Sequence, residues 1–259
     1  MIERPKYLEY RHQRDRIQSF AVKRQIETTI EQPAAALLRL VGKKTKARKD
    51  EFTEEWSIEL RTTDVMPDRS GLVKTQVTQA IRKVKGVEVP FPDRESPTTE
   101  FLNEVVDLTG KLSSHQGSLP TPHLLLFPDE PVKKGQEWQR SRYELMPVYG
   151  TDGQVKTYSA HQIDYSGRVD DLGETEDGTE YADISISGRS EFQAPSGPPQ
   201  TYTVGGTVRF ALRDGHVIHA DLTRAMLVSL GDIAVTRSVK EQFAFMSRGT
   251  EQSVGGMRI

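Results

Sequence analysis

The chain has 259 residues, with 35 lysine or arginine and 37 aspartate or glutamate residues, so its formal net charge is -2. This near balance argues against a dedicated nucleic-acid-binding domain, which is usually strongly basic, and no specific nucleic-acid binding is expected. The sequence contains no cysteine, which excludes disulfides, thiolate metal sites and cysteine nucleophiles. Because no apolar run approaches the roughly 20 residues of a membrane-spanning helix, no transmembrane segment is expected.

Alternating side chains dominate the sequence from Gln18 onward. Between Gln18 and Ile30, apolar residues fall on even positions and polar ones on odd positions, although Arg24 and Thr28 interrupt the apolar series. A period of two is typical of a strand with one buried face. The pattern returns in windows beginning at Phe52, Val73, Tyr143, Ile163, Ile184, Val208 and Val217. One wet face favours antiparallel pairing, so we predict a mainly β protein, an antiparallel β-meander of about ten to twelve strands.

Signals for helices are few. The stretch from Pro33 to Val41, followed by Gly42, predicts one short helix, because proline suits the first turn and glycine the end. A second candidate opens at Ser96, and its end fits either a helix or a strand. We expect a short helix or turn that runs into a strand near Val105.

Two parts of the chain follow a similar pattern. Asp64 and Gly71 align with Asp171 and Gly178 at a constant offset of 107 residues, and both copies have the pattern strand, acidic turn, strand. This fits a duplication, and it equally fits the common layout of β-hairpins. A duplication divides the chain into an N-terminal β-meander half (1–122), a C-terminal half (123–248) and a disordered tail (249–259). The halves are either separate domains or one curved sheet forming a half-barrel.

The junction between these halves carries Pro128, Pro131, Gly135 and Trp138 in the order Pro-x-x-Pro-Val-x-x-Gly-x-x-Trp. Proline cannot donate a ladder hydrogen bond, so we expect an extended crossing, a turn at Gly135 and a new strand anchored by Trp138. The motif resembles a signature of uncharacterised bacterial all-β proteins, many of them exported or lipid-anchored. Their broad shape is similar to the half-barrels of LolA-type lipoprotein carriers. The resemblance implies a curved sheet and a place at the cell envelope, and it brings no activity with it.

The compartment stays open at this point. The sequence starts Met1-Ile2-Glu3 and shows no apolar segment of a signal peptide. We expect a cytoplasmic protein as the sequence stands, or an envelope or secreted protein if a leader has been removed.

Residues with catalytic or metal-binding chemistry are not arranged in a recognisable pattern. His216 and His219 are three apart on an expected strand, which places them on opposite faces. Asp170 and Asp171 lie next to an expected hairpin turn, where carboxylates are ordinary solvated residues. We therefore assign no catalytic residue, metal ligand or cofactor, and favour a protein that is not an enzyme.

One cluster of positive charge stands out. It consists of Lys43, Lys44, Lys46, Arg48 and Lys49. Such a patch suits anionic lipid head groups, RNA or an acidic partner. The alternative, which we favour, is a solvated loop that keeps a sheet edge from aggregating.

The sequence supports three functional hypotheses. The first is a non-catalytic binding or carrier module for a hydrophobic or lipid-like ligand. Its expected lining is Phe20, Trp56, Ile58, Trp138 and Tyr165. The second is a structural or interaction protein that uses its sheet edges to pair with a partner or a second copy. The third, a hydrolase, is the least favoured, and the oligomeric state is left open.

Overall fold

The fold is described from a computed structural model of the chain. The description covers residues 5–31, 48–91, 102–111, 123, 125–149, 155–193, 198–230 and 233–250. In these ranges the structure is all-β and contains no helix. The helix expected at Pro33–Val41 lies outside the described residues. The strand expected near Val105 is confirmed, because residues Leu102–Val106 form β5.

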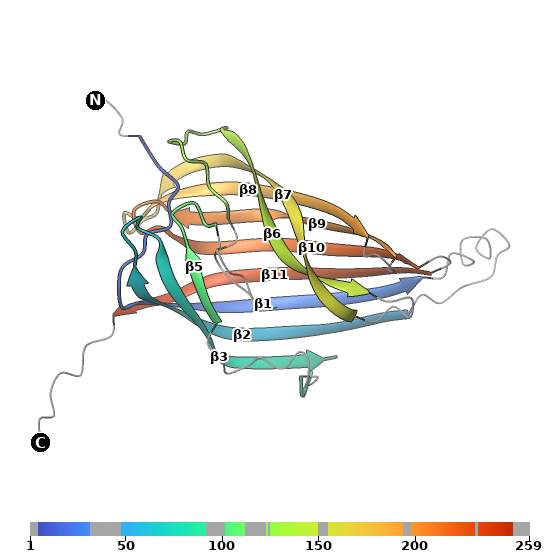
Figure 1. Cartoon of the computed structure of the whole chain (residues 1–259). Helices are drawn as coiled ribbons and strands as arrows, with labels where there is room; N and C mark the ends of the chain where they lie inside the picture. Colours follow the sequence, from blue (N-terminus) through green and yellow to red (C-terminus); the bar gives the residue numbers. More distant parts are fainter. Residues whose placement is uncertain are drawn as a thin grey trace, which may run out of the picture.

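The described residues form eleven strands in one sheet (Figure 1). They are β1 (Arg16–Glu31), β2 (Arg48–Val65), β3 (Gly71–Val84), β4 (Val87–Val89), β5 (Leu102–Val106), β6 (Glu137–Tyr149), β7 (Val155–Glu174), β8 (Glu180–Gln193), β9 (Pro199–Ala211), β10 (His216–Leu230) and β11 (Ile233–Thr250). Their order is β4-β3-β2-β1-β11-β10-β9-β8-β7-β6, with β5 beside β3. All of these pairs are antiparallel. The predicted antiparallel β architecture is therefore confirmed.

The first and last strands are neighbours in this sheet. β1 pairs with β11 along its whole length, from Arg16 opposite Thr250 to Glu31 opposite Ala234. Every other neighbouring pair along the main order joins strands consecutive in sequence. The seam between β1 and β11 therefore makes one continuous sheet of the two parts of the chain. The internal duplication stays a prediction.

The sheet is strongly curved and open. β6 pairs with β7 alone among the described strands, so the sheet does not close into a barrel. Yet Arg224 on β10 lies 3.8 Å from Glu144 on β6, although β9, β8 and β7 separate these strands in the sheet. Figure 1 shows the sheet bending so that β6 and β7 pass in front of β10 and β11. The inward-facing side chains therefore share one concave face.

β11 is a long strand that the alternation in the sequence did not single out. Its inward positions include Val235 and Phe243, which are buried, but also Glu241. A charged residue at an inward position breaks the apolar series on which the sequence prediction relied. Glu241 is stabilised at this inward position by an ion pair with Arg24, which stands opposite it on β1.

Two segments outside the strands close one end of the concave face. They comprise residues 5–14 and 125–136, here called the closing segments. Lys6 and Val132 join them through a backbone hydrogen bond of 2.7 Å. Tyr10 from the first and Phe127 from the second lie 5.0 Å apart between ring centroids, and both pack against Phe210 of β9.

The concave face holds two apolar clusters. The first lies at the end covered by the closing segments, which contribute Phe127 to it, and it also includes Phe20, Trp56, Ile58, Phe210 and Phe243. The second lies towards the other ends of the strands and comprises Leu126, Met146, Ile163, Tyr165, Tyr202, Val204, Met226, Val228 and Val235, with Ile30 and Phe192 packed against it. Burial of such side chains, at about 25 cal/mol per Å² of apolar surface, is the main force that holds the sheet in its curved form.

The proline-containing junction behaves as its sequence predicts. Residues 128–136 form no strand of the sheet, Gly135 has a φ of +80°, and β6 begins at Glu137. Trp138 packs against the first apolar cluster, and its Nε1 donates a hydrogen bond of 2.6 Å to the Leu126 carbonyl.

At the other end of the chain, β11 extends to Thr250, two residues into the segment expected to be a tail. Residues 251–259 lie outside the described residues.

Candidate functional site

A row of charged side chains crosses the concave face between the two apolar clusters. In order across the sheet its members are Arg82, Glu54, Arg24, Glu241, Arg224, Glu144 and Arg142. We call this row the charge belt. Its charges alternate in sign along the whole row, which begins and ends with an arginine. Buried ionic groups are expensive to desolvate and mark candidate functional sites.

The strand register places these charges side by side. Arg24 sits at an inward position of β1 between Val22 and Ile26. It stands opposite Glu241 on β11 and opposite Glu54 on β2. An inward charge on one strand is therefore matched by an opposite charge on each neighbouring strand, which is the favourable arrangement for cross-strand pairs.

The β3 end of the belt is tightly bonded. Arg82 donates two hydrogen bonds to Glu54 Oε1, at 3.0 Å from Nε and 2.6 Å from Nη2. The indole Nε1 of Trp56 donates to the other oxygen of Glu54 at 3.2 Å. The Arg82 guanidinium also lies over the rings of Phe52 and Phe91, at 4.4 and 4.7 Å from their centroids. This end is held by both ionic and aromatic contacts.

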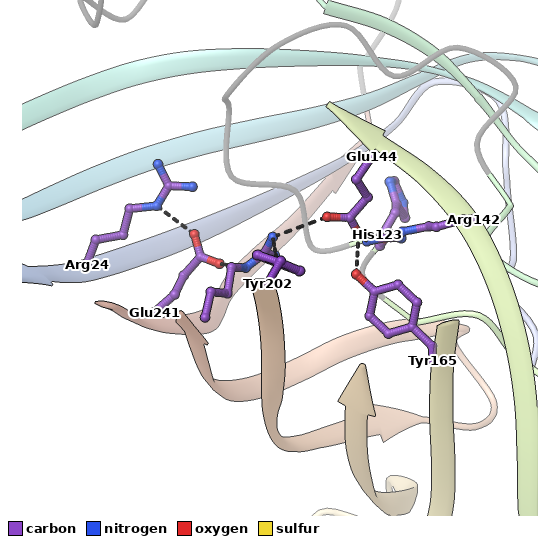
Figure 2. A network of polar contacts seen from close by, with 8 residues as sticks. Arg24, His123, Arg142, Glu144, Tyr165, Tyr202 and Glu241 are labelled. Atoms are coloured by element: carbon purple, nitrogen blue, oxygen red, sulfur yellow. Dashed lines mark hydrogen bonds and ion pairs between the residues drawn. The ribbon is translucent and has the colours of Figure 1, made fainter. Parts of the chain in front are cut away.

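The centre of the belt is Glu241, whose side chain is buried and 1% exposed. Arg24 Nε donates a hydrogen bond to its Oε1 at 2.6 Å, and Arg224 Nε lies 3.3 Å from its Oε2 (Figure 2). Burial by itself raises the pKa of Glu241, but the two guanidinium groups outweigh burial and lower the pKa below its usual value. Glu241 is therefore ionised at neutral pH.

The β6 end centres on Glu144. Its Oε1 accepts hydrogen bonds from Arg142 Nε at 2.7 Å and from the Tyr165 hydroxyl (Figure 2). Burial opposes the charge, yet Arg142, Arg224 and Tyr165 together lower the pKa of Glu144 to about 2. Burial raises the pKa of Tyr202 to about 12. The tyrosine hydroxyls in this region thus stay protonated and act as neutral hydrogen-bonding groups.

The residues predicted to line a ligand site fall into two places. Phe20, Trp56 and Ile58 are buried in the first apolar cluster, and Trp138 packs against it. Tyr165 belongs to the second cluster and bonds to the charge belt. Their role in ligand binding stays a prediction. The sequence reasoning missed the charge belt, although Arg24 stood out as an interruption of the apolar series.

Hollows among the described residues also occur on the outward face of the sheet. One of about 410 Å³ lies over Ala21 and Ala244 and is bordered by Lys23, Glu55 and His219. Another of about 510 Å³ lies beside Trp138 at the β6 edge. Both are open to solvent, and the residues that line them include no buried ionic network such as the charge belt.

The predicted basic patch is described in part. Lys43, Lys44 and Lys46 lie outside the described residues, and Arg48 and Lys49 begin β2. Lys49 Nζ lies 2.8 Å from Glu27 on the neighbouring strand, and both side chains are exposed. An exposed pair of this kind contributes little to stability. A solvated loop and a contact with an anionic partner both stay predictions for this patch.

The histidines of β10 lie on opposite faces, as their spacing predicts. His216 is buried and its Nδ1 lies 3.2 Å from Arg16 Nη2. His219 faces outward and contacts Asp221 at 2.8 Å. In the described ranges, no group of three His, Cys, Asp or Glu side chains is placed to hold a metal ion. Among the residues that the structure describes, no helix has the length and hydropathy needed to cross a membrane.

Comparison with known proteins gives little. No protein-family model and no curated protein matches the chain. Among solved structures, it is similar to a chain from a structure titled "Lipid-protein interactions in lipovitellin", with 9% sequence identity and a TM-score of 0.49. The match covers 94% of this chain and 26% of that chain, so this chain spans about a quarter of that protein's length. A likeness of this size carries no argument about what the chain does.

Proposed function

We propose that the protein is a non-catalytic binding or carrier module that holds a hydrophobic or lipid-like ligand against its concave face. The observation that carries this proposal is the layering of that face, in which the second apolar cluster adjoins the charge belt. An amphipathic surface on the inside of an open, curved sheet suits a ligand with an apolar part and a polar part.

The composition of the second cluster supports an adaptable binding surface. Met146 and Met226 both belong to it, together with Tyr165 and Tyr202. Methionine is flexible and polarisable, so methionine-containing surfaces accommodate apolar ligands of different shape. Tyrosine adds apolar area together with a hydroxyl that reaches a polar partner.

Gln200 gives a second indication. This side chain is 2% exposed, and within the described structure neither its amide nitrogen nor its amide oxygen has a hydrogen-bond partner. It stands opposite Val228, which belongs to the second cluster, and opposite Phe192, which packs against that cluster. A buried amide without partners costs about 1–3 kcal/mol for each unsatisfied group. A polar group of a bound ligand, or an ordered water beside it, would remove this cost.

Two measurements test the proposal. Native mass spectrometry after gentle extraction should show a co-purifying apolar adduct, and a fluorescent fatty-acid probe should bind saturably. Met226→Trp, which fills the second cluster, should weaken probe binding at least tenfold. Leu227→Trp is the matched control, because Leu227 is the next residue on β10 and is 42% exposed. A folded protein with neither an adduct nor saturable probe binding, or equal binding by both variants, would contradict the proposal.

A second candidate is assembly through the sheet edge. β6 is thirteen residues long and pairs on one side alone among the described strands. Its Tyr143 is 68% exposed. An exposed edge of this length can accept another strand. Light scattering decides this point, since a strict monomer at micromolar concentration would remove the candidate.

Membership of the LolA-like bacterial group, and a place at the cell envelope, remain part of this proposal. They rest on the motif from Pro128 to Trp138.

A further inference from the structure

We propose that Arg24 and Arg224 form an anion-binding subsite above Glu241, which holds the carboxylate or phosphate head group of an amphiphilic ligand. The inference rests on the proposed function, because it assigns a charge to the polar part of the ligand. It also fixes the orientation of that ligand on the concave face.

The two arginines flank one carboxylate. Arg24 lies on β1 and Arg224 on β10, and β11 with Glu241 runs between them. Figure 2 shows Arg24 reaching Glu241 from one side of the belt. The Glu241 side chain is 1% exposed, and the guanidinium groups of Arg24 and Arg224 contact its two carboxylate oxygens. Two positive charges therefore share one close negative charge.

Both guanidinium groups have hydrogen-bonding capacity to spare. Each carries five N–H donors, and within the described residues each donates one hydrogen bond, Arg24 to Glu241 and Arg224 to the Tyr202 hydroxyl at 3.4 Å. Their other ionic contacts are 3.3 Å from Arg224 to Glu241, 3.8 Å from Arg224 to Glu144 and 4.0 Å from Arg24 to Glu54. Charge-assisted hydrogen bonds of full strength are about 2.7–2.9 Å long.

These two arginines are also the most accessible members of the belt. The Arg24 side chain is 17% exposed and that of Arg224 is 25% exposed. The side chains of Arg82 and Arg142 are 8% and 9% exposed. An anion approaching along the concave face would therefore meet the side chains of Arg24 and Arg224 before the other arginines of the belt.

The neighbouring inward residues show where the rest of the ligand would lie. Two positions beyond Arg224 on β10 is Met226, a member of the second apolar cluster. Two positions beyond Arg24 on β1 is Ile26, which is buried. An apolar chain attached to an anion at the subsite would therefore run onto the second cluster. Planar guanidinium groups match the oxygen spacing of carboxylate and phosphate. For this reason we assign a carboxylate or a phosphate as the head group of the ligand.

The test compares three ligands on the wild-type protein. Decanoate and decanol share a chain length and differ in charge, and inorganic phosphate supplies an anion without a chain. We expect decanoate to bind at least tenfold more tightly than decanol, measured by calorimetry at low salt. Phosphate should fail to displace decanoate at millimolar concentration. Equal binding of decanoate and decanol would overturn the subsite and leave the proposed function intact, whereas binding of neither would contradict the proposed function itself.

Two substitutions sharpen the result. Arg224→Met should weaken decanoate binding at least tenfold while leaving decanol binding within twofold. Arg209→Met is the matched control, because Arg209 pairs with Asp183 in an exposed position and its side chain is 42% exposed. Displacement of decanoate by phosphate would show a subsite for a free anion and would overturn the assignment to an amphiphile. The wild-type comparison decides the matter even if Arg224→Met fails to fold.

Discussion

Arg24 donates a hydrogen bond of 2.6 Å to Glu241 across the seam where the first strand of the sheet pairs with the last. The two residues are 217 positions apart in the sequence. The seam joins the two parts of the chain into one sheet, and the same ion pair forms the centre of the charge belt. The residues that fix the strand order and those that define the candidate site are therefore partly the same.

Removing the charge of Glu241 should destabilise the fold strongly. Glu241→Gln preserves the shape of the side chain but leaves Arg24 and Arg224 without their shared carboxylate. Breaking a buried ion pair in this way costs about 3 kcal/mol, so the urea midpoint should fall markedly. Glu27→Gln is the control, because Glu27 pairs with Lys49 at the surface and should cost less than about 1 kcal/mol. Equal effects of the two variants would contradict a central role for Glu241.

Acid should destabilise the protein well above the pH at which carboxylates titrate. Burial lowers the pKa of His12 to about 4, of His123 to about 3 and of His216 to about 4, from 6.5. The unfolded chain binds protons below pH 6.5 and the folded chain does not, so stability is complete above pH 6.5 and is lost as the pH falls towards 4. Each histidine contributes about 1.4 kcal/mol per pH unit in this window.

Urea unfolding between pH 7 and pH 4 measures this effect. His216→Asn should reduce the slope of stability against pH, because it removes one titrating group. His219→Asn serves as the control on the outward face of the same strand. A flat profile between pH 6.5 and pH 4.5 would refute the prediction.

The Tyr165 hydroxyl should stabilise the ionised form of Glu144. Tyr165→Phe removes a buried donor to this carboxylate, and the pKa of Glu144 should then rise. We expect a loss of about 1–2 kcal/mol at pH 7 in chemical unfolding. Tyr143→Phe on the same β6–β7 hairpin is the control, since Tyr143 is 68% exposed, and it should leave stability nearly unchanged. A loss of the same size in both variants would speak against the hydrogen bond as the cause.

The indole of Trp138 needs a glycine beneath it. A Cβ at Gly167 would lie 2.3 Å from Trp138 Cζ2, so Gly167→Ala should displace the ring and cost about 2 kcal/mol. Gly205→Ala is the matched substitution, because its Cβ would meet nothing nearer than the Ile186 carbonyl at 3.6 Å. That variant should be neutral or slightly stabilising. The two thermal unfolding midpoints decide this, and a neutral Gly167→Ala would show that the ring yields easily.

Particular residues show how far the sequence could predict the site. Arg24 was visible as a charge at an apolar position of the first strand, and Glu54 and Glu241 occupy equivalent positions on the neighbouring strands. A charge at an inward position is thus the signal that could have revealed the belt. The pairing of these charges was not predictable, because it depends on which strands become neighbours.

The sequence by itself determined most of the strands and their buried faces, though not β11, because the alternation of apolar and polar side chains is a local property of an extended backbone. It also determined the turn and the new strand at Gly135 and Trp138. Only the tertiary structure decided that β1 lies beside β11 and that β6 bends over β10, bringing Glu144 to Arg224. Such contacts join residues far apart in the chain, and they form because a long twisted sheet must curl to bury its apolar face.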